Sequence, residues 1–155
     1  MKHLISLLLF LPAVSYANCK EMNQVALDFS NLYIGFLKTP GKWSDQWPNE
    51  WIQSNEYLTD EFKLSYKAIM TKAFINDSDF GLGFDPILDA QDYPNSGFVV
   101  TECDASNRRV LLQGREWVSF KLIAELKEVN NQWLVNKMGV VNDETYLRQM
   151  NNNTK

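Results

Sequence analysis

The sequence contains one histidine, His3, and it lies within the first few residues. The rest of the chain therefore lacks the imidazole that Ser-His-Asp and Cys-His catalytic groups require, and it lacks the commonest zinc ligand. A basic block is also missing, because 15 Lys and Arg stand against 19 Asp and Glu, for a formal net charge of −4. This balance argues against nucleic acids and anionic membrane surfaces as partners.

No apolar run in the sequence reaches the roughly 20 residues needed to span a bilayer. The N-terminal run, residues 4–14, follows Lys2 and precedes Ser15-Tyr16-Ala17. A positive start, a short apolar stretch and small residues before the cleavage site are typical of a secretory signal peptide. We therefore predict that residues 1–17 are cleaved near Ala17. The mature protein is expected in the periplasm or outside the cell, without stable membrane insertion.

Cysteine is scarce, and the two residues present are Cys19 and Cys103. Because an exported protein meets an oxidising environment, we predict that they form a disulfide between the start of the first helix and a distant strand. Closing a loop of about 84 residues is worth about 4–5 kcal/mol in the chain-entropy model. Two free, buried thiols are the alternative, and the lack of C-x-x-C spacing argues against a catalytic pair.

The hydrophobic pattern predicts helices first and an antiparallel sheet afterwards. Residues 22–37 have the period of an amphipathic helix, Pro48 can open a short helix, and Thr59 is a candidate N-cap for another. From residue 98 the period changes to two. The predicted strands span 98–103, 109–113, 118–127 and 132–140, with a tight turn at Asn130-Asn131 and a last short helix capped by Asp143.

This order of elements predicts an α+β fold in which the N-terminal helices pack on one face of a curved, four-stranded antiparallel sheet. Residues 18–150 have the length of one domain, and residues 151–155 form a polar tail that we expect to be flexible.

The segment from Asp85-Pro86 to Ala90-Gln91-Asp92 resembles a loop motif of small exported bacterial proteins. They form a family of unknown function with the nuclear-transport-factor-2-like, or cystatin-like cone, fold. The first helix, the start of the second at residues 58–62 and the closing hairpin at 131–135 also fit this family. The resemblance, which covers nearly all of the mature chain, implies a bent sheet wrapped by helices around a conical pocket. Enzymes of this broad fold often place His and Asp in that cone, and here the His is missing.

The acid-rich loop between residues 76 and 95 holds five aspartates and is the first candidate site. Calcium-loop spacing counted from Asp77 places Leu88 where a bidentate Glu belongs, so we predict no metal there. We expect Asp85 and Asp92 to accept backbone N–H groups and Gln91 to bridge the loop to the sheet. Paired carboxylates acting as acid and base are the catalytic alternative. The candidate binding residues of this loop are Asp85, Asp89, Gln91, Asp92 and Tyr93.

The aromatic-rich connector is the second candidate site, with Trp43, Trp47 and Trp51 as its candidate residues. If these rings are exposed, they suit sugar rings or a protein partner. The structural alternative is that they cover the open end of the cone.

These observations predict a non-enzymatic periplasmic binding or inhibitory protein that docks on a protein partner through the sheet or the loop. A concrete form is an immunity protein that neutralises a toxin acting in the periplasm. The alternative is a binder of small molecules or cell-wall fragments that uses the cone pocket. An enzyme that relies on Asp and Tyr alone is the third hypothesis, and no cofactor is predicted.

Overall fold

The computed structural model describes residues 13–39, 47–79 and 81–152, without the side chains of 13–17, 47, 48 and 151. Trp43 and most of the predicted signal peptide lie outside these residues. The elements in chain order are α1 (Ala13–Leu37), α2 (Trp47–Ser54), α3 (Asp60–Asn76), β1 (Phe98–Asp104), β2 (Arg109–Gly114), β3 (Lys121–Val129), β4 (Gln132–Met138) and α4 (Glu144–Asn152).

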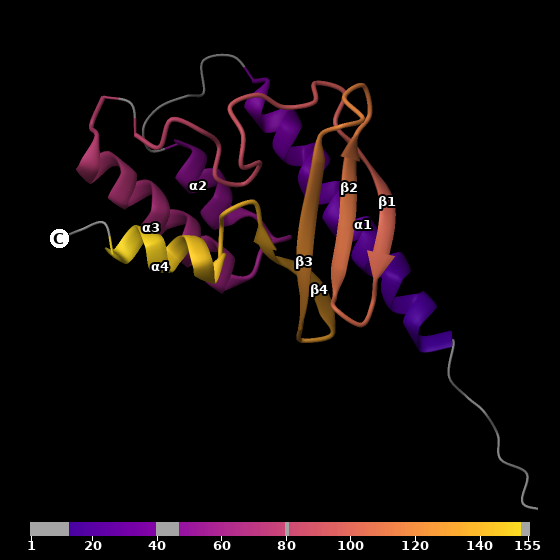
Figure 1. The fold of residues 1–155 in the computed structure, drawn as a ribbon. Helices are drawn as coiled ribbons and strands as arrows, with labels where there is room; N and C mark the ends of the chain where they lie inside the picture. Colours follow the sequence, from indigo (N-terminus) through magenta and orange to yellow (C-terminus); the bar gives the residue numbers. More distant parts are fainter. Residues whose placement is uncertain (1–12, 40–46, 80, 153–155) are drawn as a thin grey trace, which may run out of the picture.

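The four strands form one open antiparallel sheet in the order β1-β2-β3-β4. Figure 1 shows α1 crossing behind the strands, while α2, α3 and α4 lie together to one side of the sheet. The predicted α+β arrangement of helices, antiparallel sheet and short C-terminal helix is therefore confirmed. The face of the sheet turned away from α1, which is the face seen in Figure 1, is called the open face below.

The core lies between α1 and the sheet and continues under α3. On α1, Met22, Ala26 and Phe29 are fully buried, as the helical period of the sequence predicts. The strands alternate between a buried row facing α1 and a row on the open face, because successive side chains in a strand point to opposite sides. The buried row in the two middle strands consists of Val110, Leu112, Leu122, Ala124 and Leu126.

Local capping and turn chemistry fix the ends of several elements as predicted. Thr59 Oγ1 accepts a hydrogen bond from the Phe62 N–H at 3.1 Å and so caps α3. Asp143 Oδ1 accepts the Tyr146 N–H at 2.9 Å before α4. Asn130 and Asn131 have φ angles of 51° and 63°, the left-handed values that a tight hairpin between β3 and β4 requires.

Two strand boundaries differ from the prediction. The third strand begins at Lys121 rather than at residue 118, because the preceding residues turn: the Phe120 N–H donates to the Trp117 carbonyl at 2.9 Å. Val118 is consequently 59% exposed instead of buried. The fourth strand ends at Met138, because the Val140 N–H leaves the ladder and donates to the Pro86 carbonyl at 2.9 Å.

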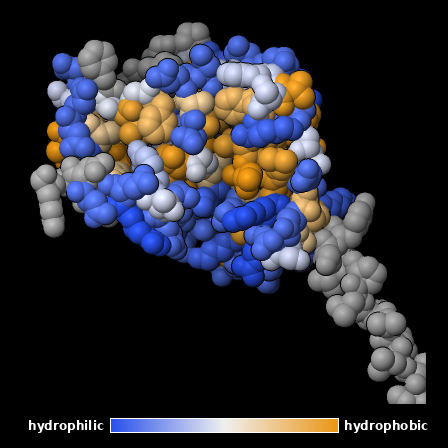
Figure 2. All heavy atoms as spheres, viewed as in Figure 1, coloured by the Kyte–Doolittle hydropathy of each residue, from blue (hydrophilic) through white to orange (hydrophobic). Residues whose placement is uncertain are grey.

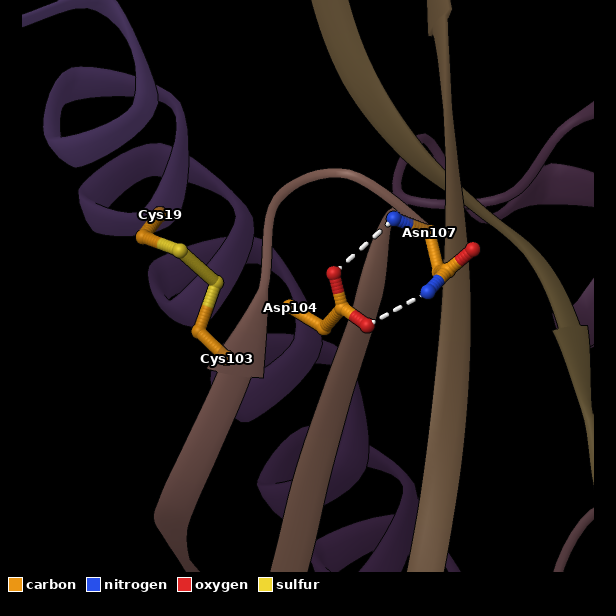
Figure 3. The surroundings of a disulfide bond; sticks show 4 residues. All are labelled: Cys19, Cys103, Asp104 and Asn107. Carbon is orange, nitrogen blue, oxygen red and sulfur yellow. Dashed lines mark hydrogen bonds between the residues drawn. A yellow bond between two sulfur atoms is a disulfide. The ribbon is translucent and has the colours of Figure 1, made fainter. Parts of the chain in front are cut away.

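Cys19 and Cys103 form the predicted disulfide, with their Cα atoms 5.9 Å apart. Figure 3 shows Cys19 on α1 pointing at Cys103 near the end of β1, next to the turn that Asp104 and Asn107 stabilise. In the described part of the chain, no helix combines the length and apolar character required to cross a membrane.

Candidate functional site

Asp85 anchors the acid-rich loop to the core. Its Oδ1 accepts the backbone N–H groups of Ile87 and Leu88 at 2.8 and 2.9 Å. Its Oδ2 accepts the Tyr33 hydroxyl at 2.5 Å. The predicted role of Asp85 as an acceptor of backbone N–H groups is therefore confirmed. Sequence reasoning missed the partner on α1, because no local pattern indicates which distant side chain meets a loop.

The electrostatics of this cluster suit a structural role better than a catalytic one. Burial raises the pKa of Asp85, although the hydrogen bonds to its carboxylate lower it in part. Burial, together with the charge of Asp85, raises the pKa of Tyr33 and of Tyr66. Both phenols are only 2% exposed, so they keep their protons and are closed to a substrate. The cluster thus holds the loop on α1.

The other candidate residues of the loop do not converge on Asp85. Asp89 and Asp92 are exposed, and Tyr93 is partly buried against the core. Gln91 Nε2 donates to the Gly83 carbonyl at 3.1 Å, so it links two parts of the loop, and the prediction that it bridges the loop to the sheet was wrong. For Asp92 no hydrogen bond to another described residue is found. Among the described residues, no group of three or more His, Cys, Asp or Glu could hold a metal ion.

Of the three tryptophans in the aromatic connector, Trp51 is the one whose side chain the structure describes. Its ring centroid lies 4.7 Å from that of Phe36 and 5.7 Å from that of Tyr33, within the aromatic core under α1. Trp51 is therefore partly buried against the rings of α1 rather than freely exposed. Trp47 begins α2, but its side chain lies outside the described part, as does all of Trp43.

A groove of about 690 Å³ lies between β3 and the acid-rich loop. Its apolar lining includes Leu88, Trp117, Phe120 and Ile123. Trp117 and Ile123 are 42% and 49% exposed, and the rings of Trp117 and Phe120 meet edge to face at 5.1 Å. Figure 2 shows apolar side chains gathered in a band across this side of the molecule. Asp89, one of the predicted binding residues, also lines the groove.

Charged side chains line the other part of the groove. Arg109 Nη2 lies 2.8 Å from Glu125 Oε1, and Lys137 Nζ lies 3.7 Å from the same oxygen. Lys137 also pairs with Asp143 at 2.7 Å, and this hydrogen bond raises the pKa of Lys137 and lowers that of Asp143. The groove therefore combines an apolar part with a fixed row of opposite charges, an arrangement suited to recognising a protein surface.

Sequence reasoning did not single out this groove. One available signal was Ile123, which occupies an exposed position of the third strand between Lys121 and Glu125. A single such residue is common on protein surfaces, but Ile123 shares the groove with the exposed Trp117, and apolar residues exposed together mark interaction sites. Comparisons of the chain with protein-family models, curated proteins and solved structures find no significant match.

Proposed function

We propose that this protein is an exported, non-enzymatic binding protein that acts by contact with a protein partner in the periplasm. The open face of the sheet, with its groove, is the recognition surface. An immunity-type inhibitor of a periplasmic toxin is the concrete form of this proposal. The nuclear-transport-factor-2-like cone remains the proposed fold family, supported by the long helix on one face of an open antiparallel sheet.

One observation carries the proposal: large apolar side chains are exposed together on the side of the sheet that α1 leaves uncovered. Trp117 and Ile123 are each more than 40% exposed, and both line the groove beside β3. Trp is enriched among residues that dominate binding energy, and charged groups at the rim add specificity. Arg109 and Glu125 supply such charges at one part of the groove.

The space inside the fold favours this proposal over the small-molecule alternative. The interior between α1, α3 and the sheet holds five large aromatic side chains, each no more than 2% exposed: Phe29, Tyr33, Phe62, Tyr66 and Phe98. A cone filled in this way leaves less room for a ligand. The open groove is the better candidate for recognition.

The test is affinity purification from periplasmic extract with the mature, oxidised domain as bait. Three baits are compared: wild type, Ile123→Lys in the groove, and Ile75→Lys on α3. Ile75 is the matched control, because it is 78% exposed and does not line the groove.

We expect a stoichiometric partner to be retained by wild type and by Ile75→Lys, and to be at least tenfold depleted with Ile123→Lys. A partner held equally by all three baits would remove the open face from the proposal. Failure of the wild-type bait to retain any partner would argue against the binding function itself.

A further inference from the structure

The edge of the sheet next to α1 has hydrogen-bonding groups that the fold leaves free. β1 is an edge strand and pairs only with β2 among the described strands. Figure 1 shows the N-terminal turns of α1 extending past this edge. Asn31 on α1 uses its side-chain amide here: Oδ1 accepts the Phe98 N–H at 2.8 Å, and Nδ2 donates to the Phe98 carbonyl at 3.5 Å. The amide of Asn31 therefore stands where the peptide group of a neighbouring strand would stand.

Within the described part of the chain, the same geometry leaves the backbone N–H and C=O of Val100 without a hydrogen-bond partner. The register between β1 and β2 is regular from Phe98 to Val100 and shifts only before Glu102. In a regular strand, the N–H and C=O of every second residue point to the same edge. Val100 therefore directs its N–H and C=O away from β2, as Phe98 does. No other described residue forms a hydrogen bond with these groups.

A groove of about 330 Å³ lies between this edge and α1. It is lined by Cys19, Lys20, Asn23, Gln24, Leu27 and Val100. Asn23 Oδ1 is buried and has no hydrogen-bond partner among the described residues. A buried amide oxygen without a donor destabilises a fold, and such groups call for an explanation. A ligand that brings an N–H group into the groove would supply the missing donor.

The charges indicate the chemistry of that ligand. Among the described residues of the lining, Lys20 is the only charged one, and no other described residue forms an ion pair with it. Glu102 and Asp104 lie directly opposite Leu111 and Arg109 on β2, whose side chains are on the open face. The two acidic side chains therefore point to the open face and not toward this groove. An acidic group is therefore complementary to this groove, in a chain whose net charge is otherwise negative.

We propose that the groove between α1 and β1 binds an extended peptide segment of a partner protein. The segment adds to β1 by backbone hydrogen bonds at Val100, donates an N–H group to Asn23, and places an acidic side chain near Lys20. Addition of a strand to a free sheet edge is a general mode of peptide recognition. The register shift after Val100 limits the added strand to a few residues. This site shares no lining residue with the open-face groove, so it stands independently of the function proposed above.

The test uses a phage-displayed library of random seven-residue peptides, selected on the immobilised, oxidised domain. We expect enriched peptides to contain alternating β-branched residues and at least one acidic residue. In the complex with a synthetic copy of an enriched peptide, hydrogen exchange of the Val100 amide slows at least tenfold, as measured by NMR.

Two variants give readouts that separate binding from folding. Asn23→Leu removes the unpartnered amide, so it maintains or raises Tm while weakening peptide binding at least tenfold. Val100→Pro removes an N–H group that points away from β2. It should therefore weaken peptide binding while the hydrogen bonds between β1 and β2 are kept. Ile75→Lys on α3 is the control and leaves binding unchanged.

Any one of four results would overturn the proposal. The first is that peptides are enriched no more on the domain than on a surface without it. The second is that Asn23→Leu does not weaken peptide binding. The third is that the peptide does not slow hydrogen exchange of the Val100 amide. Dimerisation of the domain through β1 in place of peptide binding would also overturn it.

Discussion

Asp85 connects two segments that are far apart in the sequence, since its carboxylate binds the Tyr33 hydroxyl on α1 and two amides of its own loop. A carboxylate in this position must lose part of its hydration. The three hydrogen bonds offset that loss only in part, so the pKa of Asp85 remains above its usual range. The anchoring of the loop should therefore respond to pH.

We expect the stability that Asp85 contributes to decrease as pH rises. Burial raises its pKa in the folded state, so the folded protein binds this proton more tightly than the unfolded chain does. The stabilising effect is fully present below the ordinary pKa, about 4, and is lost as pH rises through the raised value. Urea unfolding of wild type and Asp85→Asn at a series of pH values measures it: the difference in unfolding free energy should fall across this window.

Asp104→Asn is the matched control for this titration. Asp104 accepts a hydrogen bond from the Asn107 side chain, which lowers its pKa. Its contribution is present above the ordinary pKa and is lost as pH falls through the lowered one. The difference in unfolding free energy between wild type and variant should therefore fall with rising pH for Asp85→Asn and increase with rising pH for Asp104→Asn. A curve for Asp85 that is flat, or that rises with pH, would contradict the burial of its carboxylate.

Gly139 is a second residue on which the attachment of the loop depends. It has a φ of 57°, and a Cβ at this position would lie 2.4 Å from the Pro86 carbonyl oxygen and 2.5 Å from that of Ile87. Gly139→Ala should therefore lower the free energy of unfolding by more than about 3 kcal/mol, as a strained and overpacked site does.

Gly83→Ala is the control for Gly139→Ala. Gly83 has a similar φ of 74°, but a Cβ there would meet no atom within 4 Å. It should cost only the left-handed backbone strain, about 1 kcal/mol. Equal losses for the two variants in chemical denaturation would mean that the contact between Gly139 and the loop is not tight.

At the scale of elements, the long helix α1 and the edge strand β1 are joined by two different devices. Near the start of α1 the Cys19–Cys103 disulfide is covalent, and further along the helix the Asn31 amide forms hydrogen bonds with Phe98. Together these contacts hold α1 across the sheet, on which the core depends.

Removal of the disulfide should destabilise the domain without changing its fold. Replacement of both Cys19 and Cys103 by Ser frees a loop of 84 residues in the unfolded chain. The expected loss of unfolding free energy is about 2–4 kcal/mol. Guanidinium unfolding of the oxidised protein and the double variant measures it, and reduced wild type should match the variant. Equal stability of oxidised protein and variant would show that the link adds nothing.

For the whole molecule, the sheet has one face in the core and one face that the described helices leave largely uncovered. The neighbouring residues Leu122 and Ile123 point to opposite faces of the sheet: Leu122 is 5% exposed in the core, and Ile123 is 49% exposed on the open face. Leu122 therefore contributes to folding, whereas Ile123, one residue further along β3, belongs to the proposed recognition surface.

The same substitution at these two positions should have very different effects on stability. Leu122→Lys buries an unpaired charge against α1, so we expect a loss of more than about 3 kcal/mol or failure to fold. Ile123→Lys should remain within about 1 kcal/mol of wild type. Thermal and urea unfolding of both variants test this, and comparable losses would mean that the open face is part of the core.

Much of the fold could be predicted from local patterns in the sequence. Thr59 caps α3, Asn130 and Asn131 form the hairpin, and the two cysteines pair. The site was less predictable: the start of β3 was missed because the turn at Trp117 to Phe120 depends on a backbone hydrogen bond that alternation does not encode. The role of Gln91 was misjudged because its partner, Gly83, lies within the same loop.

By itself, the sequence determined the features that depend on neighbouring residues: helical and strand periods, caps, turns and the availability of two cysteines for pairing. Only the tertiary structure decided which distant groups meet. It placed Tyr33 on Asp85 and Trp51 in the aromatic core. It also left Asn23 Oδ1 without a hydrogen-bond partner among the described residues, and Ile123 on an uncovered face. The physical reason is that periodicity and capping act over a few residues, whereas burial and exposure depend on packing between segments that are far apart in the chain.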